Sequence, residues 1–191
     1  MDLYHVLNRG TDKRAIFMDD RDRLRFVRNL FEMNDSKHVF NTGRTLAGLP
    51  DIRRRVEHDP LVTVHGWCLM NNHYHLLLSE VQEKGISRFL QKINMGYSKY
   101  FNLRHNRVGT LFQGKTKKKL IDRETYFLWI LHYIHFNPLD YLESAATWRK
   151  KKVLNSSKAL DWLIKYRWSS FPDYMGVKNF PDIVTTSFMN H

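Results

Sequence analysis

The sequence predicts an α+β fold in which helices pack against a central antiparallel sheet. Segments with a β-type pattern and segments with helical spacing of apolar residues follow one another in the order β-α-β-β-α-β-α. Hydrophobic residues make up 42% of the 191 residues, which is sufficient for the core of one domain. This order of elements is typical of a ferredoxin-like sandwich.

The first part of the chain is expected to contain a strand, a helix and a long irregular segment. Residues 4–9 predict a short strand that ends at a glycine and a polar turn. Asp19 or Asp20 can cap the next helix, in which apolar residues recur at helical spacing as far as Met33. Residues 34–60 lose this spacing and contain glycine, proline and clustered arginines, so we expect a long loop or insertion there.

A β-hairpin and a second helix are expected next. Residues 61–70 and 74–79 are rich in β-forming residues and flank the turn pair Asn71-Asn72. Apolar and aromatic residues then recur with helical spacing over 86–101, which predicts a helix packed on the sheet.

A last strand, a last core helix and a C-terminal extension complete the expected fold. Residues 111–120 predict a strand with a strongly basic second half. Asp122 can cap the helix that follows, and Pro138 stops that helix. Residues 140–191 are expected to form a basic and helical extension packed on the core, with a helix over 156–166.

The charge of the chain favours a polyanionic partner. Thirty-one Lys and Arg residues against 19 Asp and Glu give a formal net charge of +12. The single cysteine, Cys68, excludes an intrachain disulfide. The N-terminus lacks a signal-peptide pattern, and the apolar stretch 127–136 is far shorter than the roughly 20 residues of a membrane span. We therefore expect a cytoplasmic protein without membrane contact.

The sharpest local motif is Asn71-Asn72-His73-Tyr74-His75. Alternate residues of a strand share one face, so His73 and His75 can point at one ion while Tyr74 points into the core. Imidazole is the commonest metal ligand in proteins. Two half-exposed histidines at a strand edge would give the same pattern.

A second motif lies some 60 residues later in the predicted last core helix. Tyr133 and Asn137 are four residues apart, which places them on one helix face. An amide oxygen suits Mg²⁺ or Mn²⁺, and a tyrosine hydroxyl can act as a covalent nucleophile. The alternative is that Tyr133 belongs to an apolar stripe of the core. Because Asn137 precedes a proline, we expect it at the end of the helix.

Together these elements resemble the HUH (histidine–hydrophobe–histidine) single-tyrosine transposases, and specifically the REP-associated tyrosine transposases. The resemblance covers residues 4–139, so that residues 1–139 are expected to form a transposase domain with the HUH endonuclease fold. Besides the two motifs above, it rests on Tyr4-His5-Val6, Asn8-Arg9-Gly10, Ile16-Phe17, Tyr97-Ser98-Lys99-Tyr100-Phe101-Asn102 and Leu111-Phe112-Gln113-Gly114-Lys115, with a weak extension to Trp168-Ser169-Ser170.

The resemblance implies a metal-dependent, single-strand DNA endonuclease and strand transferase that acts on hairpin-bearing repeat DNA. His73 and His75 would bind the divalent cation, Mg²⁺ or Mn²⁺, with Asn137 as the third ligand. Tyr133 would attack a phosphodiester and form a 5′-phosphotyrosine link, leaving a free 3′-OH. The link conserves the energy of the broken bond, so strands can be rejoined without a high-energy cofactor.

Basic residues are expected to contact the DNA. Arg9 lies in the turn where this family reads a short single-stranded tag beside the foot of a hairpin. The other expected DNA-binding residues are Lys115, Lys117, Lys118, Lys119, Arg149 and Lys150. Such side chains mostly contact phosphates, so the affinity should fall steeply with salt.

Several alternatives stay open at the level of sequence. Tyr97 and Tyr100 lie on a helix that shares the resemblance and are rival nucleophiles, although Tyr133 is preferred because Asn137 lies one turn away. A non-catalytic nucleic-acid-binding protein with a ferredoxin-like fold would explain the basic charge as well. An autonomous insertion-sequence transposase is a third possibility. Both a monomer and a homodimer are compatible with the sequence.

Overall fold

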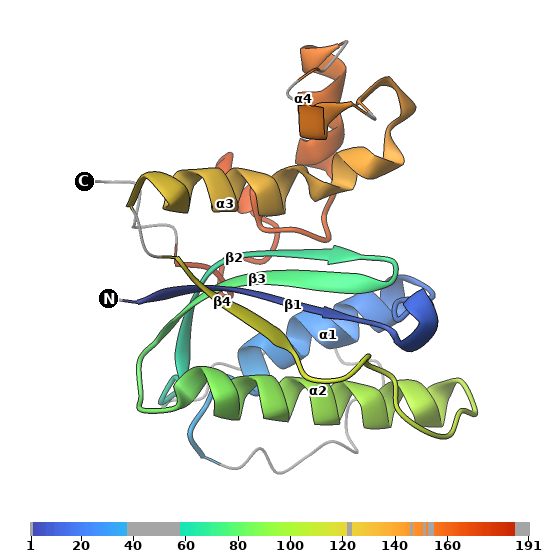
Figure 1. Ribbon diagram of the computed structural model, residues 1–191, viewed down its shortest axis with the longest axis vertical. Helices are drawn as coiled ribbons and strands as arrows, with labels where there is room; N and C mark the ends of the chain where they lie inside the picture. The colour runs from blue at the N-terminus through green and yellow to red at the C-terminus, as the bar shows by residue number, and fades with distance from the viewer. Residues whose placement is uncertain are drawn as a thin grey trace.

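The computed structural model is a sheet covered by helices on both faces (Figure 1). The described residues are 2–37, 58–121, 124–145, 147–150, 152 and 155–185. The sheet has the strand order β2-β3-β1-β4, every neighbouring pair is antiparallel, and the strands are β1 (Leu3–Arg9), β2 (Val62–Met70), β3 (His73–Glu80) and β4 (Lys117–Ile121). The core helices are α1 (Asp20–Glu32), α2 (Gly85–Arg104) and α3 (Glu124–Phe136). The predicted α+β fold with a ferredoxin-like order of elements is confirmed.

The two faces of the sheet pack against different helices. One face of the sheet packs against α1 and α2, and Val6 and Tyr74 on this face have no exposed surface. The other face packs against α3, where Leu77 packs with Ile134 in a second cluster. Each fully buried aliphatic side chain contributes roughly 1.5–3 kcal/mol, so both layers hold the strands in register. This register decides which strand residues can reach α3.

Helix α1 begins where the sequence predicts. The side chain of Asp19 accepts a hydrogen bond from the N–H of Asp22 at 3.0 Å and thereby caps the helix. Asp22 is itself fully buried and accepts hydrogen bonds from Tyr100 and Arg104 of α2. This network fixes the two helices against each other on the face opposite α3.

The predicted strand over 111–120 is wrong in its first half. β4 begins only at Lys117, and the residues before it are irregular apart from one bridge between Phe112 and Gly10. Gly114 has φ +64°, a left-handed conformation that interrupts an extended strand.

Some sequence predictions concern residues outside the described parts of the chain. Residues 38–57 of the predicted insertion at 34–60 belong to this group, as does Asp122. The described ends of the insertion meet, because the N–H of Ser36 donates to the carbonyl oxygen of Asp59 at 2.8 Å. None of the helices in the described parts has the length and apolar character that a membrane crossing requires.

The C-terminal extension packs along the outer edge of β2. Its elements are η3 (Asn137–Tyr141), η4 (Glu143–Ala145), η5 (Trp148–Lys150), α4 (Ser156–Lys165) and α5 (Phe171–Tyr174). The N–H of Leu69 donates to Trp168 at 2.9 Å, and Ser170 and Trp67 exchange further bonds of 2.9 and 3.0 Å. The extension therefore satisfies the edge of β2 that would otherwise be open. The helix predicted over 156–166 agrees with α4 to one residue.

Candidate active site

Three histidines meet on the face of the sheet that packs against α3. His73 and His75 share this face because they alternate along β3, and their ring centroids are 5.0 Å apart. His5 reaches them from β1: its ring stacks on His75 with centroids 5.1 Å apart, and its Nε2 is 2.9 Å from Nδ1 of His75. Tyr74 is fully buried in the opposite layer, as predicted.

Helix α3 places the ring of Tyr133 beside the histidines. The ring centroid is 5.7 Å from that of His75 and 6.1 Å from that of His5, both in edge-to-face geometry. Trp129, one turn earlier on the helix, stacks on Tyr133 with centroids 5.5 Å apart and fixes the plane of the ring. The structure therefore brings the predicted nucleophile and the predicted histidine pair together within one chain.

Arg149 of the C-terminal extension binds the hydroxyl of Tyr133. Its Nη1 donates to Tyr133 Oη at 3.2 Å, and its guanidinium lies 4.4 Å from the ring centroid of Trp148. Its Nη2 donates to Asp140 at 2.6 Å. Asp140 and Trp148 thus hold a permanent cation against the phenol oxygen.

Asn137 lies one turn after Tyr133 and is fully buried at the start of η3. Its Nδ2 donates to the carbonyl oxygen of Tyr133 at 2.6 Å, and its Oδ1 accepts from Arg149 at 3.1 Å. Helix α3 ends at Phe136, and Pro138 lies in the 3₁₀ turn that follows, as the sequence predicts. The amide oxygen therefore faces Arg149, and its role as a metal ligand stays a prediction.

Burial keeps the three histidines neutral. Desolvation, with a smaller effect of the Arg9 charge, lowers the pKa of His73 to about 4. Desolvation and the charge of Lys119 lower the pKa of His5 to about 4. The pKa of His75 also lies well below its usual value, mainly through burial. At neutral pH these imidazoles carry no charge, which is the form that binds metal ions.

Two of the three predicted ligands fit a divalent cation. Nδ1–H of His73 donates to Asn72 Oδ1 at 2.7 Å, which leaves the lone pair of the ring on Nε2. The bond between His5 and Nδ1 of His75 can orient the second imidazole in the same way. Such second bonds commonly orient metal-binding histidines. The described residues contain no group of three or more His, Cys, Asp or Glu that could hold a metal. A cation held by His73 and His75 would need amide, water or phosphate oxygens as its further ligands.

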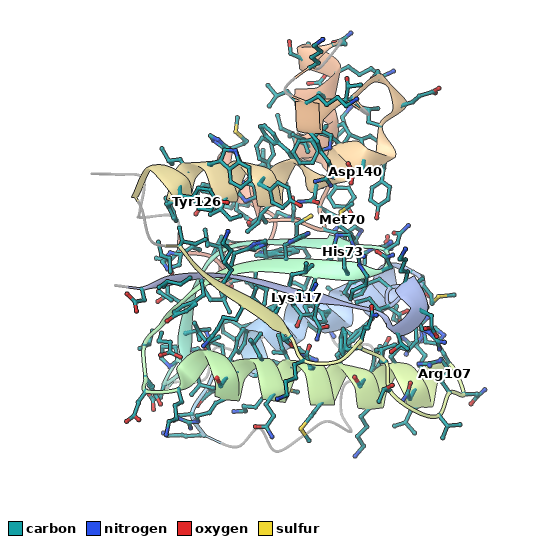
Figure 2. All side chains as sticks on the ribbon, in the orientation of Figure 1. Met70, His73, Arg107, Lys117, Tyr126 and Asp140 are labelled. Carbon is teal, nitrogen blue, oxygen red and sulfur yellow. The ribbon has the colours of Figure 1, made fainter. Side chains whose placement is uncertain are left out.

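Apart from Arg149, which binds Tyr133, the predicted DNA-binding residues fall into two groups. Arg9, Lys117 and Lys119 face the site: Arg9 pairs with His73 across β1 and β3, while Lys119 pairs with His5. Figure 2 labels Lys117 on the edge strand β4 and His73 on the side of the sheet that faces α3.

The remaining lysines lie away from the histidines. Lys118 points to the other face of β4, where its ammonium is 4.7 Å from the centroid of the Tyr4 ring. Lys115 and Lys150 are exposed, Lys115 before β4 and Lys150 at the end of η5. The structure brings neither of them to the site.

The rival tyrosines have structural partners. Tyr97 has no exposed surface, and its hydroxyl donates to the carbonyl oxygen of Ile16. The hydroxyl of Tyr100 bonds Asp22 at 3.2 Å. Both lie in the layer opposite α3, so neither is near the histidine pair.

Sequence reasoning did not assign His5 and Asp140 to the site. The alternation of side chains along β1 could have predicted that His5 lies at the site, because it places His5 on the same face of the strand as Arg9. No local pattern indicates that Asp140 holds Arg149, since the two residues come from different 3₁₀ turns.

Buried histidines predict a loss of stability in mild acid. Burial is the main cause that lowers the pKa of His135 to about 3 and that of His65 to about 4. Between pH 6.5 and those values the unfolded chain binds protons that the folded chain does not. The free energy of unfolding should therefore fall with decreasing pH, by about 1.4 kcal/mol per pH unit for each such histidine. Urea unfolding at pH 7, 5.5 and 4.5 measures this slope.

His135→Gln provides the matched test of this slope. Glutamine does not titrate, so the dependence of the free energy of unfolding on pH should become shallower. Its side chain can still form the bond of 2.8 Å that His135 makes with Ser170. The control is His132→Gln, on the exposed side of the same helix. Equal slopes for the wild type and His135→Gln would contradict the expectation.

A family model of known proteins matches part of the chain. Residues 26–135 match a family model described as "Transposase IS200 like". This region contains His73, His75 and Tyr133, whereas His5, Asn137 and Arg149 lie outside it. No curated protein sequence matches the chain.

A solved structure shares the fold. It is described as "Structure of the REP associates tyrosine transposase bound to a REP hairpin". The similarity covers 96% of this chain and 84% of that chain, with a TM-score of 0.52 and 11% sequence identity. At that identity the likeness concerns the fold, including the helical C-terminal region.

Proposed function

The chain belongs to the IS200-like transposase family, and on that premise we propose that it is a metal-dependent, single-strand DNA endonuclease and strand transferase. The observation that carries the proposal is the position of Tyr133: its ring lies against His75 while its hydroxyl is bound by Arg149. A core tyrosine would need neither a neighbouring pair of neutral imidazoles nor a cation on its oxygen. The arrangement suits attack of a phenol oxygen on a phosphodiester.

In the proposed reaction, Oη of Tyr133 forms a bond to phosphorus and the bond from phosphorus to the 3′ oxygen breaks. The phenol proton is lost, the 3′ oxygen gains a proton, and the DNA 5′ end stays attached to tyrosine. Rejoining reverses these steps with another 3′-OH. The phenolate is a better leaving group than an alkoxide, so the covalent link can be resolved again.

Arg149 is proposed to hold the phenol oxygen in place for the attack and then to contact the phosphate. Its guanidinium already donates to Oη, and a bound phosphate would place a second anion within reach of the same side chain. A fixed cation acts most strongly where charge develops during the reaction. Asp140 keeps the guanidinium in place between turnovers.

His73 and His75 are proposed to hold Mg²⁺ or Mn²⁺ through Nε2, with Asn137 as an additional ligand. When bound, the cation polarises a phosphate oxygen and offsets the charge that accumulates at phosphorus. For Asn137 to take part, its Oδ1 must share or give up the bond to Arg149. Arrival of the substrate phosphate at Arg149 offers a reason for that exchange.

The DNA substrate is proposed to be a hairpin with single-stranded flanks. Arg9, Lys117 and Lys119 supply positive charge on the same face as the histidines, which fits a phosphate backbone. The similar solved structure is described as bound to a REP hairpin, and this supports the same class of substrate here. Because Tyr133 and His75 meet within one chain, we propose that a monomer contains a complete site.

An adduct assay tests the proposed function. Labelled hairpin DNA with single-stranded flanks is incubated with the protein and Mn²⁺ or Mg²⁺, then denatured and run on a gel. The proposal expects a protein–DNA adduct that resists denaturation and disappears with EDTA. DNA binding without any adduct would instead favour a non-catalytic DNA-binding protein.

Replacing Arg149 with alanine should slow adduct formation about 100-fold, which is the usual cost of losing one preorganised donor to a developing charge. Arg149→Lys should recover part of the rate, because it keeps the charge but loses the second donor. The rate is measured at saturating DNA. Lys150→Ala is the matched control, because it removes the same charge one residue away from the site. A loss confined to DNA affinity in Arg149→Ala would contradict the assigned role.

A further inference from the structure

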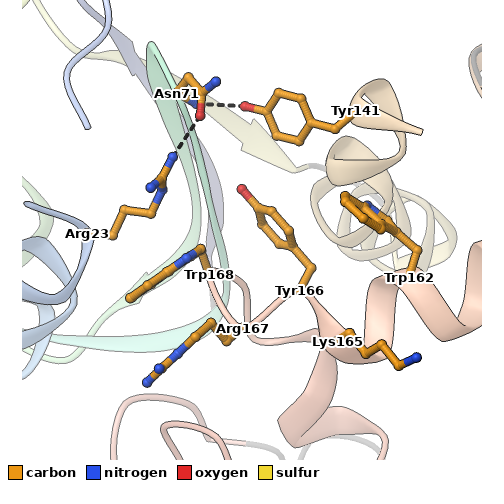
Figure 3. Close-up of a pocket in the computed structure, with 8 residues that line it drawn as sticks. All are labelled: Arg23, Asn71, Tyr141, Trp162, Lys165, Tyr166, Arg167 and Trp168. Carbon is orange, nitrogen blue, oxygen red and sulfur yellow. Dashed lines mark hydrogen bonds between the residues drawn. The ribbon is translucent and has the colours of Figure 1, made fainter. Parts of the chain in front are cut away.

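A pocket of about 340 Å³ lies between the core and the C-terminal extension (Figure 3). Arg23 of α1 and the hairpin residue Asn71 form one side, and Arg23 donates to Asn71 Oδ1 at 2.8 Å. The other lining residues come from the extension: Tyr141, Trp162, Lys165, Tyr166, Arg167 and Trp168. Figure 3 shows Arg23 and Tyr141 reaching Asn71 from opposite sides.

The lining combines aromatic rings with positive charge. It contains four aromatic rings and three cations and no carboxylate. Two of the cations, Lys165 and Arg167, are exposed at its rim. Aromatic faces stack nucleobases, and neighbouring cations contact the phosphates that connect them. A duplex offers no free base faces, so this composition favours unpaired nucleotides.

The rings are held in position by bonds through their polar atoms. The hydroxyl of Tyr166 donates to the carbonyl oxygen of Leu69 at 2.7 Å, and that of Tyr141 accepts from Asn71 N–H at 2.8 Å. Nε1 of Trp162 donates to the carbonyl oxygen of Pro138 at 3.1 Å. These bonds orient three of the rings and leave their faces for base recognition, which requires little rearrangement. Trp168 is 7% exposed and packs against Phe180 and the two arginines, so it supports the pocket wall.

Two residues that line the pocket are close in sequence to residues of the candidate active site. Asn71 begins the turn that leads into His73. Tyr141 directly follows Asp140, the carboxylate that holds Arg149. Two residues of extended chain span at most about 7 Å, so Asn71 of the pocket lies close to His73. Most of the lining lies beyond residue 135, where the match to the family model ends.

We propose that this pocket binds an unpaired nucleotide of the DNA substrate next to the cleavage position. The inference rests on the proposed function, since it assumes single-stranded DNA at the histidine site. It assigns to the C-terminal extension a part in choosing the substrate. Because stacking is tolerant of sequence, the pocket would select single-stranded over paired flanks more strongly than one base over another.

Binding measured without metal tests the pocket separately from catalysis. Lys165→Ala/Arg167→Ala is compared with Lys99→Ala/Lys158→Ala, which removes the same charge from exposed positions outside the pocket. Each protein is titrated in EDTA with a hairpin that has a single-stranded flank and with a blunt hairpin of the same stem. Loss of two phosphate contacts should weaken binding of the flanked hairpin about 10-fold, with less than about 2-fold change for the blunt one. The control variant should bind both DNAs like the wild type.

Crosslinking provides a second measurement on the wild-type protein. A 5-iododeoxyuridine in the flank, activated by light, should attach to Trp162, Tyr166 or another ring of the pocket, as located by peptide mass spectrometry. Equal losses on both hairpins, or crosslinks only outside the pocket, would overturn the proposal. If the wild type also forms no adduct with Mn²⁺, the proposed function fails independently of the pocket.

Discussion

Tyr133→Phe is expected to abolish the covalent protein–DNA adduct and to lower strand cleavage by at least about 10⁴-fold, because the nucleophilic oxygen is removed. The ring itself is retained, and with it the stacking on Trp129 and the edge contact with His75. The lost bond to Arg149 should cost no more than about 1–3 kcal/mol of stability. DNA binding should therefore stay close to that of the wild type. Adduct formation and binding are measured on the same hairpin.

Tyr126→Phe is the matched control for this variant. Tyr126 lies on the same helix and stacks on the other side of Trp129, with centroids 5.0 Å apart. It should form the adduct at the rate of the wild type. An adduct that persists in Tyr133→Phe would overturn the assignment, and peptide mapping would then identify the tyrosine that carries the DNA.

The fold could be predicted because its signals are local. The β-forming residues and turn signals of β1 and β3, the helical spacing in α1 and α2, and the cap at Asp19 each depend on residues within a few positions of one another. The error at 111–120 has a physical reason. The residues before β4 are apolar enough for a strand, yet Gly114 takes a left-handed conformation that only the folded chain reveals.

The site could be predicted in part. The histidine pair follows from strand alternation, and the choice of Tyr133 from helix spacing and the family resemblance. The partners of these residues come from distant parts of the chain: His5 is 70 residues from His75, and Arg149 is 16 residues from Tyr133. Pairing of β1 with β3 and folding of the extension over α3 create these contacts, and no local pattern encodes them.

Replacing both His73 and His75 with alanine should remove metal binding and with it adduct formation. These imidazoles are neutral at pH 7, their ring centroids are 5.0 Å apart, and each contacts a neighbour through Nδ1. Together they would supply the nitrogen ligands of the proposed cation site through Nε2. We expect the affinity for Mn²⁺, measured by isothermal titration calorimetry, to fall by at least about 100-fold. His132→Ala, an exposed histidine on α3, is the control and should bind Mn²⁺ like the wild type.

His5→Ala separates a ligand from a residue that orients a ligand. His5 contacts His75 through one hydrogen bond and a stacked ring, and it is the partner of Nδ1 rather than of Nε2. Its loss should therefore weaken Mn²⁺ binding by about 10-fold to 100-fold, less than loss of the pair itself. His5→Asn, which can keep a hydrogen-bonding group at that place, should recover part of the affinity. If removal of His73 and His75 left Mn²⁺ binding unchanged, the cation would bind elsewhere, and the three histidines would have to be regarded as a buried polar cluster of the sheet.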